Sequence, residues 1–303
     1  MILCHGLLAT DFLAPVSFPV PRDVKVRLER FFRQGGGPAA NAAVAIARLG
    51  GRATFAGAVG DDEIGRAQRA ELMAEGVDVA GVEIVAGAPA FVCFILVDEA
   101  DGARTIYSAP QTRPLRASTA DPLPGVRPAL VLVDGWGGPS QGATVAAARA
   151  AGIPVMLDAG SVRDDVVALL DQSDVVIGSE PFARELAGAD DPRAALRLLL
   201  ERGARMAAVT RGERGVVAAT ADGGFEFPAH PVRAVDTTGA GDAFHGGAAW
   251  ALAAGHDFET ALRIGAVVAA LKCRTPGARA GLPGREAVET ALGASLTPPR
   301  IHP

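Results

Sequence analysis

The chain has 303 residues, 49% hydrophobic and 21% charged, so it can bury one large core or two small ones. A formal net charge of −5, with no block of Lys or Arg, argues against a nucleic-acid-binding protein. Charged residues, Gly or Pro interrupt every apolar stretch before membrane-spanning length, and residues 1–21 lack the basic start of a secretory signal. Three widely spaced cysteines, Cys4, Cys93 and Cys273, predict no disulfide framework and indicate a cytoplasmic protein.

Strand-like apolar runs alternate with helical patterns along most of the chain. The expected strands are residues 2–9, 53–59, 129–134, 154–158, 174–178, 206–210 and 215–220. The expected helices are residues 38–49, 61–75, 140–151, 163–170, 180–187, 191–202, 240–253, 257–272 and 284–292. This alternation predicts an α/β fold with a doubly wound, mostly parallel central sheet flanked by helices. Ligands of such sheets bind beyond the carboxyl ends of the strands.

Two β-rich segments, 12–34 and 88–113, interrupt the alternation, because neither lies where a crossover helix is expected. We interpret them as a small β-sheet lid inserted into a single domain that spans residues 1–303. The alternative is that they add edge strands to the main sheet. The Pro-rich end of the chain, residues 297–303, is expected to be frayed.

The strongest chemical signal is the run DTTGAGD at residues 236–242, which opens an expected helix. Gly239, Ala240 and Gly241 leave backbone N–H groups accessible at the positive end of the helix dipole, where a phosphoryl group can bind. Asp242 lies in the first helical turn, where a carboxylate can take the proton of an attacking hydroxyl as a general base. The simpler interpretation is that Asp242 caps the helix.

The run GGGPAANAAVAIARLG at residues 35–50 is a second distinctive segment. Gly36 and Gly37 allow a ligand to approach the backbone closely. The amide of Asn41, the only asparagine of the chain, offers both a donor and an acceptor to a polyol. Asp11, at the end of the first expected strand, can accept hydrogen bonds from two hydroxyl groups. Its alternative role is that of a turn residue before the lid.

These two runs, in this order, resemble the N-terminal and C-terminal signatures of the PfkB (ribokinase-like) carbohydrate kinases. The resemblance implies a ribokinase-like fold and ATP-dependent phosphorylation of a hydroxyl group on a small sugar, with Asp242 as the base. It also implies that Asp11, Gly36, Gly37 and Asn41 contact the sugar, and that the lids of two chains pair in a homodimer. The rival nucleotide-binding runs GxxxxGK[ST] and GxGxxG do not occur in the sequence.

The expected nucleotide site is less distinctive. The run TRGERG follows an apolar strand and resembles the loop that lies near the ATP phosphates in this family. Its matching residues are Thr210, Gly212 and Gly215. Lys272 and Gly277, after the helix expected to end at residue 272, correspond to the part of these kinases that lines the adenine pocket.

The resemblance also implies metal ions. Mg²⁺ is expected because phosphoryl transfer between polyanions needs charge neutralisation. Asp236 and Thr238 correspond to positions that bind a monovalent cation such as K⁺ in some members, although they can instead stabilise the turn. The Asn-x-x-Glu run that organises Mg²⁺ in many members is replaced here by SEPF at residues 179–182, so only Glu180 remains to act through water.

The substrate is less well defined than the reaction. Several segments look closest to the ketohexokinase and sulfofructose kinase branch, which implies either a neutral ketose or an acidic, sulfonated sugar. Lys25 on the expected lid can reach an anionic end of such a substrate, or it can be a solvated charge. A nucleoside kinase of the same fold, such as an adenosine kinase, is a second interpretation, which an aromatic content of 5% disfavours. A sugar-binding regulatory protein without catalysis is a third.

Overall fold

The computed structural model of the chain describes residues 1–109, 115, 117–118, 123 and 127–296. Residues 110–113 of the second expected lid segment and the Pro-rich tail 297–303 therefore lie outside the described residues. Within the described part, no helix combines the length and the apolar character needed to cross a membrane. The three cysteines are free and buried.

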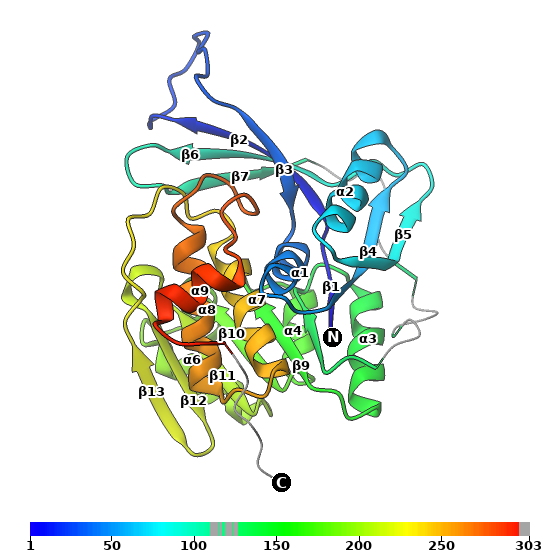
Figure 1. Ribbon diagram of the computed structural model, residues 1–303, viewed down its shortest axis with the longest axis vertical. Coiled ribbons are helices and arrows are strands. Elements are labelled where there is room, and N and C mark those ends of the chain that lie inside the picture. The colour runs from blue at the N-terminus through cyan, green and yellow to red at the C-terminus, as the bar shows by residue number, and fades with distance from the viewer. Residues whose placement is uncertain (110–114, 116, 119–122, 124–126, 297–303) are drawn as a thin grey trace.

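The main sheet of the described residues has nine strands in the order β13-β12-β11-β10-β9-β8-β1-β4-β5 (Figure 1). Parallel pairings join the seven neighbouring strands from β5 to β11, whereas β12 is antiparallel to both of its neighbours. The order reverses between β1 and β8, which creates a crevice at the carboxyl ends of these two strands. The strands are β1 Ile2–His5, β4 Ala53–Gly60, β5 Asp78–Val85, β8 Leu130–Val133, β9 Val155–Ala159, β10 Val175–Ser179, β11 Met206–Thr210, β12 Val216–Thr220 and β13 Gly223–Phe227.

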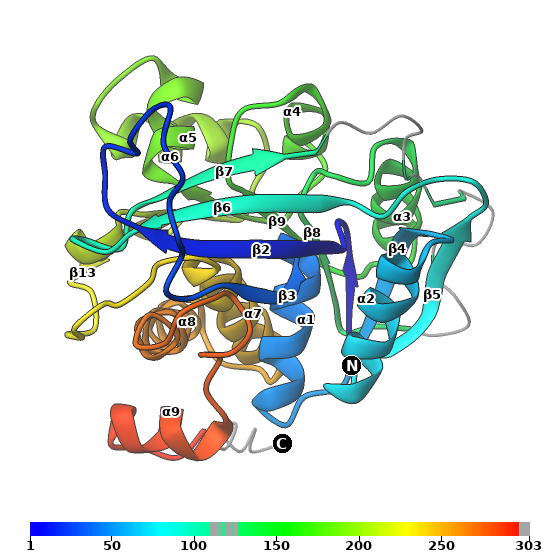
Figure 2. The same cartoon turned by 90° about the horizontal axis from the view of Figure 1, so that it is seen from above.

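Helices cover both faces of the main sheet (Figure 2). One face carries α1 Pro38–Arg48, α2 Glu63–Ala74, α7 Ala240–Ala253, α8 Phe258–Lys272 and α9 Arg285–Leu292. The other carries α3 Pro139–Ala150, α4 Asp164–Leu170, α5 Glu180–Ala187 and α6 Pro192–Glu201. Successive strand residues enter opposite cores: Cys4 packs with α1 and α7, and Leu3 packs with α3 to α6. The expected doubly wound, mostly parallel sheet is therefore confirmed.

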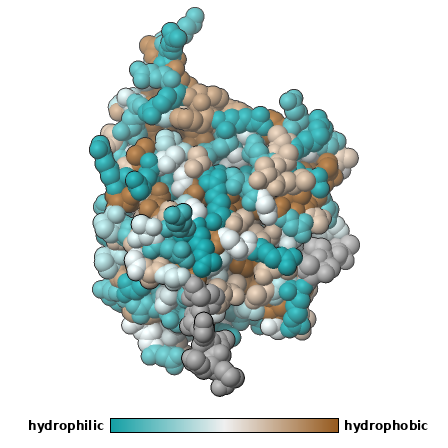
Figure 3. Space-filling model, viewed as in Figure 1, coloured by the Kyte–Doolittle hydropathy of each residue, from teal (hydrophilic) through white to brown (hydrophobic). Residues whose placement is uncertain are grey.

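Four strands form a second, separate sheet in the order β3-β2-β6-β7. Its strands are β2 Ala9–Val16, β3 Phe32–Gly36, β6 Val92–Asp98 and β7 Arg104–Ser108; β2 is parallel to β6, and the other pairings are antiparallel. The sheet lies above the carboxyl ends of the main-sheet strands (Figure 1). The two interrupting segments therefore do not extend the main sheet. The connection 17–31 between β2 and β3 projects from the top of the molecule (Figures 1 and 3).

The structure differs from the expected strands in two respects. Residues 2–9 are not one strand, because β1 ends at His5 and, after only three intervening residues, the chain enters β2 of the other sheet at Ala9. Gly6 allows this transition, since a Cβ at that position would lie 2.1 Å from a carboxylate oxygen of Asp134. The strands β5 and β13 were not expected, because both are half-exposed edge strands without a continuous apolar run.

Candidate active site

The start of α7 forms the centre of the site. Gly239 precedes the helix with a φ of +73°, a left-handed conformation that favours glycine. The N–H of Ala240 donates to the carbonyl of Thr237 (3.1 Å), so one amide of the expected phosphoryl-binding turn is engaged in the turn itself. Gly241 is exposed, and a Cβ added there would meet open space. Asp242 follows as a partly exposed residue of the first helical turn.

A cluster of polar groups, the polar cluster, lies on one side of Asp242. Asn41 of α1 donates a hydrogen bond from Nδ2 to Asp242 Oδ2 (2.6 Å). Gly36, at the end of β3, lies against Asp11 of β2, because a Cβ on Gly36 would be 2.3 Å from Asp11 Oδ2. Asp11 therefore belongs to the second sheet and not to the end of the first main-sheet strand. Four elements bring these predicted residues together.

Arg279, which the sequence analysis did not single out, belongs to the polar cluster. It follows α8, and only 5% of its surface is exposed. Its Nε donates to Asn41 Oδ1 (2.8 Å) and its Nη2 donates to the carbonyl of Gly36 (3.0 Å). Burial lowers the pKa of Arg279 to about 10, which leaves the guanidinium charged at neutral pH.

The carboxyl group of Asp11 titrates far from its ordinary range. Burial, together with the negative charge of Asp242, raises the pKa of Asp11 to about 7, although Arg279 and a hydrogen bond with the Cys93 thiol act in the opposite direction. Asp11 therefore gains and loses its proton near neutral pH, in contact with the expected sugar site.

Asp134, at the carboxyl end of β8, holds the crevice together. Its Oδ2 accepts from the N–H groups of Leu7 (2.9 Å) and Ala39 (3.1 Å), so it links the end of β1 to the first turn of α1. Gly37 allows this close approach: its φ is +96°, and a Cβ there would lie 2.2 Å from the carbonyl oxygen of Leu7. Gly37 thus allows the backbone to pack closely at the edge of the polar cluster.

A larger cleft, with a volume of about 830 Å³, lies on the other side of the start of α7. This volume falls in the usual range for small-molecule sites, roughly 300–1,000 Å³. The cleft is lined by the predicted nucleotide-binding residues Thr210, Gly212 and Gly215. Ala240 and Gly241 line the cleft as well, and the next residue of α7, Asp242, contacts the polar cluster.

Two predicted nucleotide-binding residues do not line the cleft. Lys272 is fully buried, and its ammonium donates to the carbonyl of Asp236 (2.8 Å) because α8 turns this side chain inward. The N–H of Gly277 donates to Asp236 Oδ2 (2.6 Å). Cys273, the neighbour of Lys272, lines the cleft instead. The structure thus gives Lys272 and Gly277 a role in supporting the loop before α7.

Asp236 and Thr238 lie in that same loop. Asp236 Oδ1 accepts from the N–H of Thr238 (2.8 Å) and Oδ2 accepts from Gly277, so both carboxylate oxygens stabilise the turn. The buried hydroxyl of Thr238 has no hydrogen-bond partner among the described residues. Asp236 therefore has the structural role that was left open as an alternative.

The remaining predicted residues, Glu180 and Lys25, lie apart from the polar cluster. Glu180, the first residue of α5, forms an ion pair with Arg214 beside the 210–215 loop. Lys25 is exposed in the projecting connection 17–31. The described residues include no group of three or more His, Cys, Asp or Glu side chains placed to hold a metal ion.

A buried ion pair beneath α7 was also missed by the sequence analysis. His245 Nδ1 lies 2.7 Å from the carbonyl of Gly241 and 3.3 Å from Asp158 Oδ2, and its Nε2 lies 3.1 Å from the carbonyl of Ile177. Both ring nitrogens thus face carbonyl oxygens, which only accept, and Asp158 lies beside Nδ1, where it can balance the charge of a protonated imidazole. Burial raises the pKa of Asp158 to about 7, an effect that the charge of His245 opposes. This pair supports the Gly241 end of the helix.

Comparisons with known proteins agree with this geometry. The whole arrangement is that of a ribokinase-like kinase: a crystal structure from Agrobacterium tumefaciens assigned as a ribokinase has a TM-score of 0.87 at 33% identity, covering 96% of this chain and 97% of that one. An Escherichia coli protein assigned as ribokinase II, in complex with ATP and Mg²⁺, has a TM-score of 0.82 at 22% identity, with 96% and 98% covered, and shows the fold alone. The expected ribokinase-like fold is confirmed.

The sequences give the family. The model described as "pfkB family carbohydrate kinase" matches residues 1–285. The chain is 31% identical over 266 residues to fructokinase-1 of Oryza sativa subsp. japonica, with 81% of each protein covered. It is 29% identical over 277 residues to ribokinase of Haemophilus influenzae, with 83% of this chain and 85% of that protein covered. The chain belongs to the pfkB family of carbohydrate kinases, and it is a phosphotransferase with an alcohol group as acceptor.

Proposed function

We propose that this kinase transfers the γ-phosphoryl group of ATP directly to a hydroxyl of a small sugar, with Asp242 as the general base. One observation carries the proposal: Asp242 contacts Asn41 of the polar cluster and directly follows Ala240 and Gly241, which line the 830 Å³ cleft. The acceptor alcohol and the nucleotide can therefore approach the same carboxylate from two sides. We place the reaction in the cytoplasm, where ATP is available and the three free thiols stay reduced.

The residues of the chain divide the work. Asn41 occupies Asp242 Oδ2, which leaves Oδ1 to take the proton of the attacking hydroxyl. Asp11, in its ionised form, accepts hydrogen bonds from other sugar hydroxyls and fixes the orientation of the ring. The exposed Gly241 at the positive end of the helix dipole stabilises negative charge on the group in transfer.

Metal ions fit the site unequally. Mg²⁺, when bound, neutralises charge on the ATP phosphates and usually keeps several waters, so it needs no all-protein cage. Glu180 fits poorly as its partner, because Arg214 already pairs with that carboxylate. For K⁺, the unpartnered hydroxyl of Thr238 remains, since both oxygens of Asp236 accept N–H groups. ADP release in K⁺ against Na⁺ buffer tests this ion.

We propose a neutral ketose such as D-fructose as the acceptor. The polar cluster holds two carboxylates, Asp11 and Asp242, and the guanidinium of Arg279 beside them already binds Asn41 and Gly36. A sulfonate or carboxylate on the sugar would meet these negative charges, and Lys25 lies on the projecting connection. This charge balance disfavours the acidic sugar.

A nucleoside acceptor is the second candidate, and one observation favours it. Trp136, just after β8, is 42% exposed, packs edge-on against Phe91 and lies under the guanidinium of Arg163. Such a ring can stack on a purine. Against it, Phe12, Phe94 and Tyr107 are register partners next to Asp11 and Cys93, so they point to the opposite face of the second sheet from Asp11.

The test is an ADP-release assay with ATP and D-fructose, D-ribose, adenosine, a sulfonated sugar and a carboxylated sugar. We expect the highest turnover with D-fructose and loss of turnover in Asp242→Asn. A preference for adenosine would favour a nucleoside as the acceptor. A preference for an acidic sugar would overturn the proposal that the acceptor is a neutral ketose. A protein that binds a sugar but releases no ADP would refute the kinase proposal.

We further propose that the outer face of the second sheet pairs with a second copy of this chain. Phe94 and Tyr107 are 52% and 56% exposed there, Phe31 is 57% exposed, and Phe12 stacks on both phenylalanine rings. An exposed aromatic row on a sheet is suited to an isologous contact. Sedimentation analysis should show a dimer that Phe94→Glu converts to a monomer. A wild-type monomer at micromolar concentration would refute this.

A further inference from the structure

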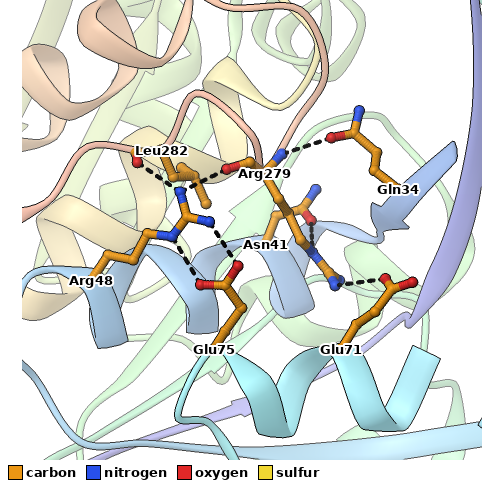
Figure 4. Close-up of polar contacts among 7 residues, drawn as sticks. All are labelled: Gln34, Asn41, Arg48, Glu71, Glu75, Arg279 and Leu282. Atoms are coloured by element: carbon orange, nitrogen blue, oxygen red, sulfur yellow. Dashed lines mark hydrogen bonds and ion pairs between the residues drawn. The ribbon is translucent and has the colours of Figure 1, made fainter. Parts of the chain in front are cut away.

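The guanidinium of Arg279 lies at the centre of a buried polar network that joins the loop after α8 to α1, α2 and β3 (Figure 4). Its Nε and Nη2 bind Asn41 of α1 and Gly36 of β3, and its Nη1 lies 3.8 Å from Glu71 Oε2 of α2. Its own N–H donates to Gln34 Oε1 (3.2 Å). Side and main chain of one residue thus connect the loop after α8 to both the second sheet and two helices.

The contact with Asn41 has a chemical direction. A side-chain amide can present either its oxygen or its nitrogen, but a guanidinium only donates. Arg279 Nε therefore requires Asn41 Oδ1 to face it, and the amide nitrogen must then point the other way, toward Asp242 Oδ2. With Arg279 in place, Asn41 cannot offer its oxygen to Asp242, so the carboxylate always receives an N–H at one defined oxygen.

We infer that Arg279 is a positioning residue that acts through Asn41 to hold the carboxylate of Asp242 in place. Its catalytic consequence rests on the proposed role of Asp242 as the base; the orientation of Asn41 does not. Three further charged groups interact with Asp242, namely Asp11 of β2, Asp158 of β9 and Lys272 of α8. Two of these are carboxylates, so Arg279 supplies the nearby positive charge that offsets them, together with the contact that orients Asn41.

The neighbouring Arg48 provides a matched control. It donates to both oxygens of Glu75 (2.9 and 2.7 Å) and to the carbonyls of Arg279 (2.9 Å) and Leu282 (2.8 Å) (Figure 4). Arg48 therefore holds the same loop as Arg279 does, but it makes no hydrogen bond to Asn41 among the described contacts. Replacing Arg48 loosens the loop and leaves the amide contact, whereas replacing Arg279 removes the contact itself.

The experiment uses the single asparagine of the chain. Protein labelled with ¹⁵N at the asparagine amide gives one Nδ2 signal pair, which reports on Asn41 without any ligand. In the wild type we expect the two amide proton signals to lie further apart than those of a free asparagine amide, because one proton is held by a carboxylate. This separation should fall to that of a free amide in Arg279→Met and in Asp242→Ala, which adds no second asparagine. It should persist in Arg48→Met.

Each outcome decides the inference. Wild-type signals at the positions of a free asparagine amide, or equal collapse in Arg279→Met and Arg48→Met, overturn it. If Arg279→Met does not fold, Arg279→Lys is used, because one ammonium cannot replace both the Nε and the Nη2 contacts; unchanged signals in that variant also overturn the inference.

Kinetics with ATP and D-fructose separate this inference from the proposed function. Arg279→Lys should lower kcat by about tenfold to a hundredfold with little change in KM for ATP, as expected when a reacting group is misplaced. No ADP release in the wild type would refute the proposed activity, while the amide signals would still decide the role of Arg279.

Discussion

Asn41 and Asp242 are 201 positions apart in the sequence, yet a hydrogen bond of 2.6 Å joins their side chains. The bond places the expected sugar-binding amide on the proposed catalytic base before any ligand arrives. It therefore connects the two signature runs of the sequence physically, and it divides the carboxylate of Asp242 into one occupied and one available oxygen.

Replacing the base should separate chemistry from binding. In Asp242→Asn the side-chain shape and the contact with Asn41 are kept, but the proton acceptor is lost. We expect kcat to fall at least about a hundredfold with little change in KM for the sugar. ADP release over a range of sugar concentrations measures both values. A loss of less than about tenfold would remove Asp242 from the base role.

Asp11 should make the ligand-free protein less stable as pH rises. Its pKa is raised from an ordinary value near 3.8 to about 7, so its contribution to stability is fully present below about pH 4 and is lost as pH rises through about 7. The free energy of unfolding of Asp11→Asn should therefore exceed that of the wild type by about 3 kcal/mol more at pH 8 than at pH 5. Urea unfolding at both pH values measures this. Parallel pH dependence in the two proteins would contradict the prediction.

Two glycines should respond to alanine in opposite ways. A Cβ on Gly36 would lie 2.3 Å from Asp11 Oδ2, whereas a Cβ on Gly241 meets open space. Gly36→Ala should lower the Tm and raise KM for the sugar by about tenfold, because Asp11 must move. Gly241→Ala should keep its Tm, since alanine suits a helix, but should lose kcat because the methyl group stands beside the transferred phosphoryl group. Thermal unfolding combined with ADP release distinguishes them; a normal kcat in Gly241→Ala would exclude this turn from the reaction.

The buried ion pair beneath α7 should be costly to break. His245→Leu leaves the carbonyls of Gly241 and Ile177 without their donor and Asp158 without its counter-ion. We expect a loss of about 3–5 kcal/mol in the free energy of unfolding. Urea unfolding at pH 7 measures this, with Asp158→Asn as the milder companion. A loss below about 1 kcal/mol would mean that the imidazole is not doubly protonated.

The sequence predicts the elements with strong periodicity and misses those formed by their partners. The expected helix 240–253 agrees with α7, Ala240–Ala253, because a glycine turn and an apolar stretch define both of its ends. The edge strand β13 was not predicted, because the run Gly223–Phe227 has little apolar character of its own and depends on pairing with β12.

The candidate site follows the same rule. Asp11, Asn41 and Asp242 lie in runs whose glycines and helix starts indicate ligand binding, and the structure brings them together. Arg279 lies in a Gly-rich loop whose residues carry no periodic signal, and its role arises from β3, α1 and α2. The resemblance predicts Lys272 at the adenine pocket, but the sequence could not indicate that its ammonium donates to the buried carbonyl of Asp236.

The separation of these residues along the chain has a consequence for biosynthesis. Asn41 leaves the ribosome 201 residues before Asp242, and Arg279 is added later still. The first strand of the second sheet must therefore wait for the loop after α8 before its inward carboxylate acquires a compensating cation.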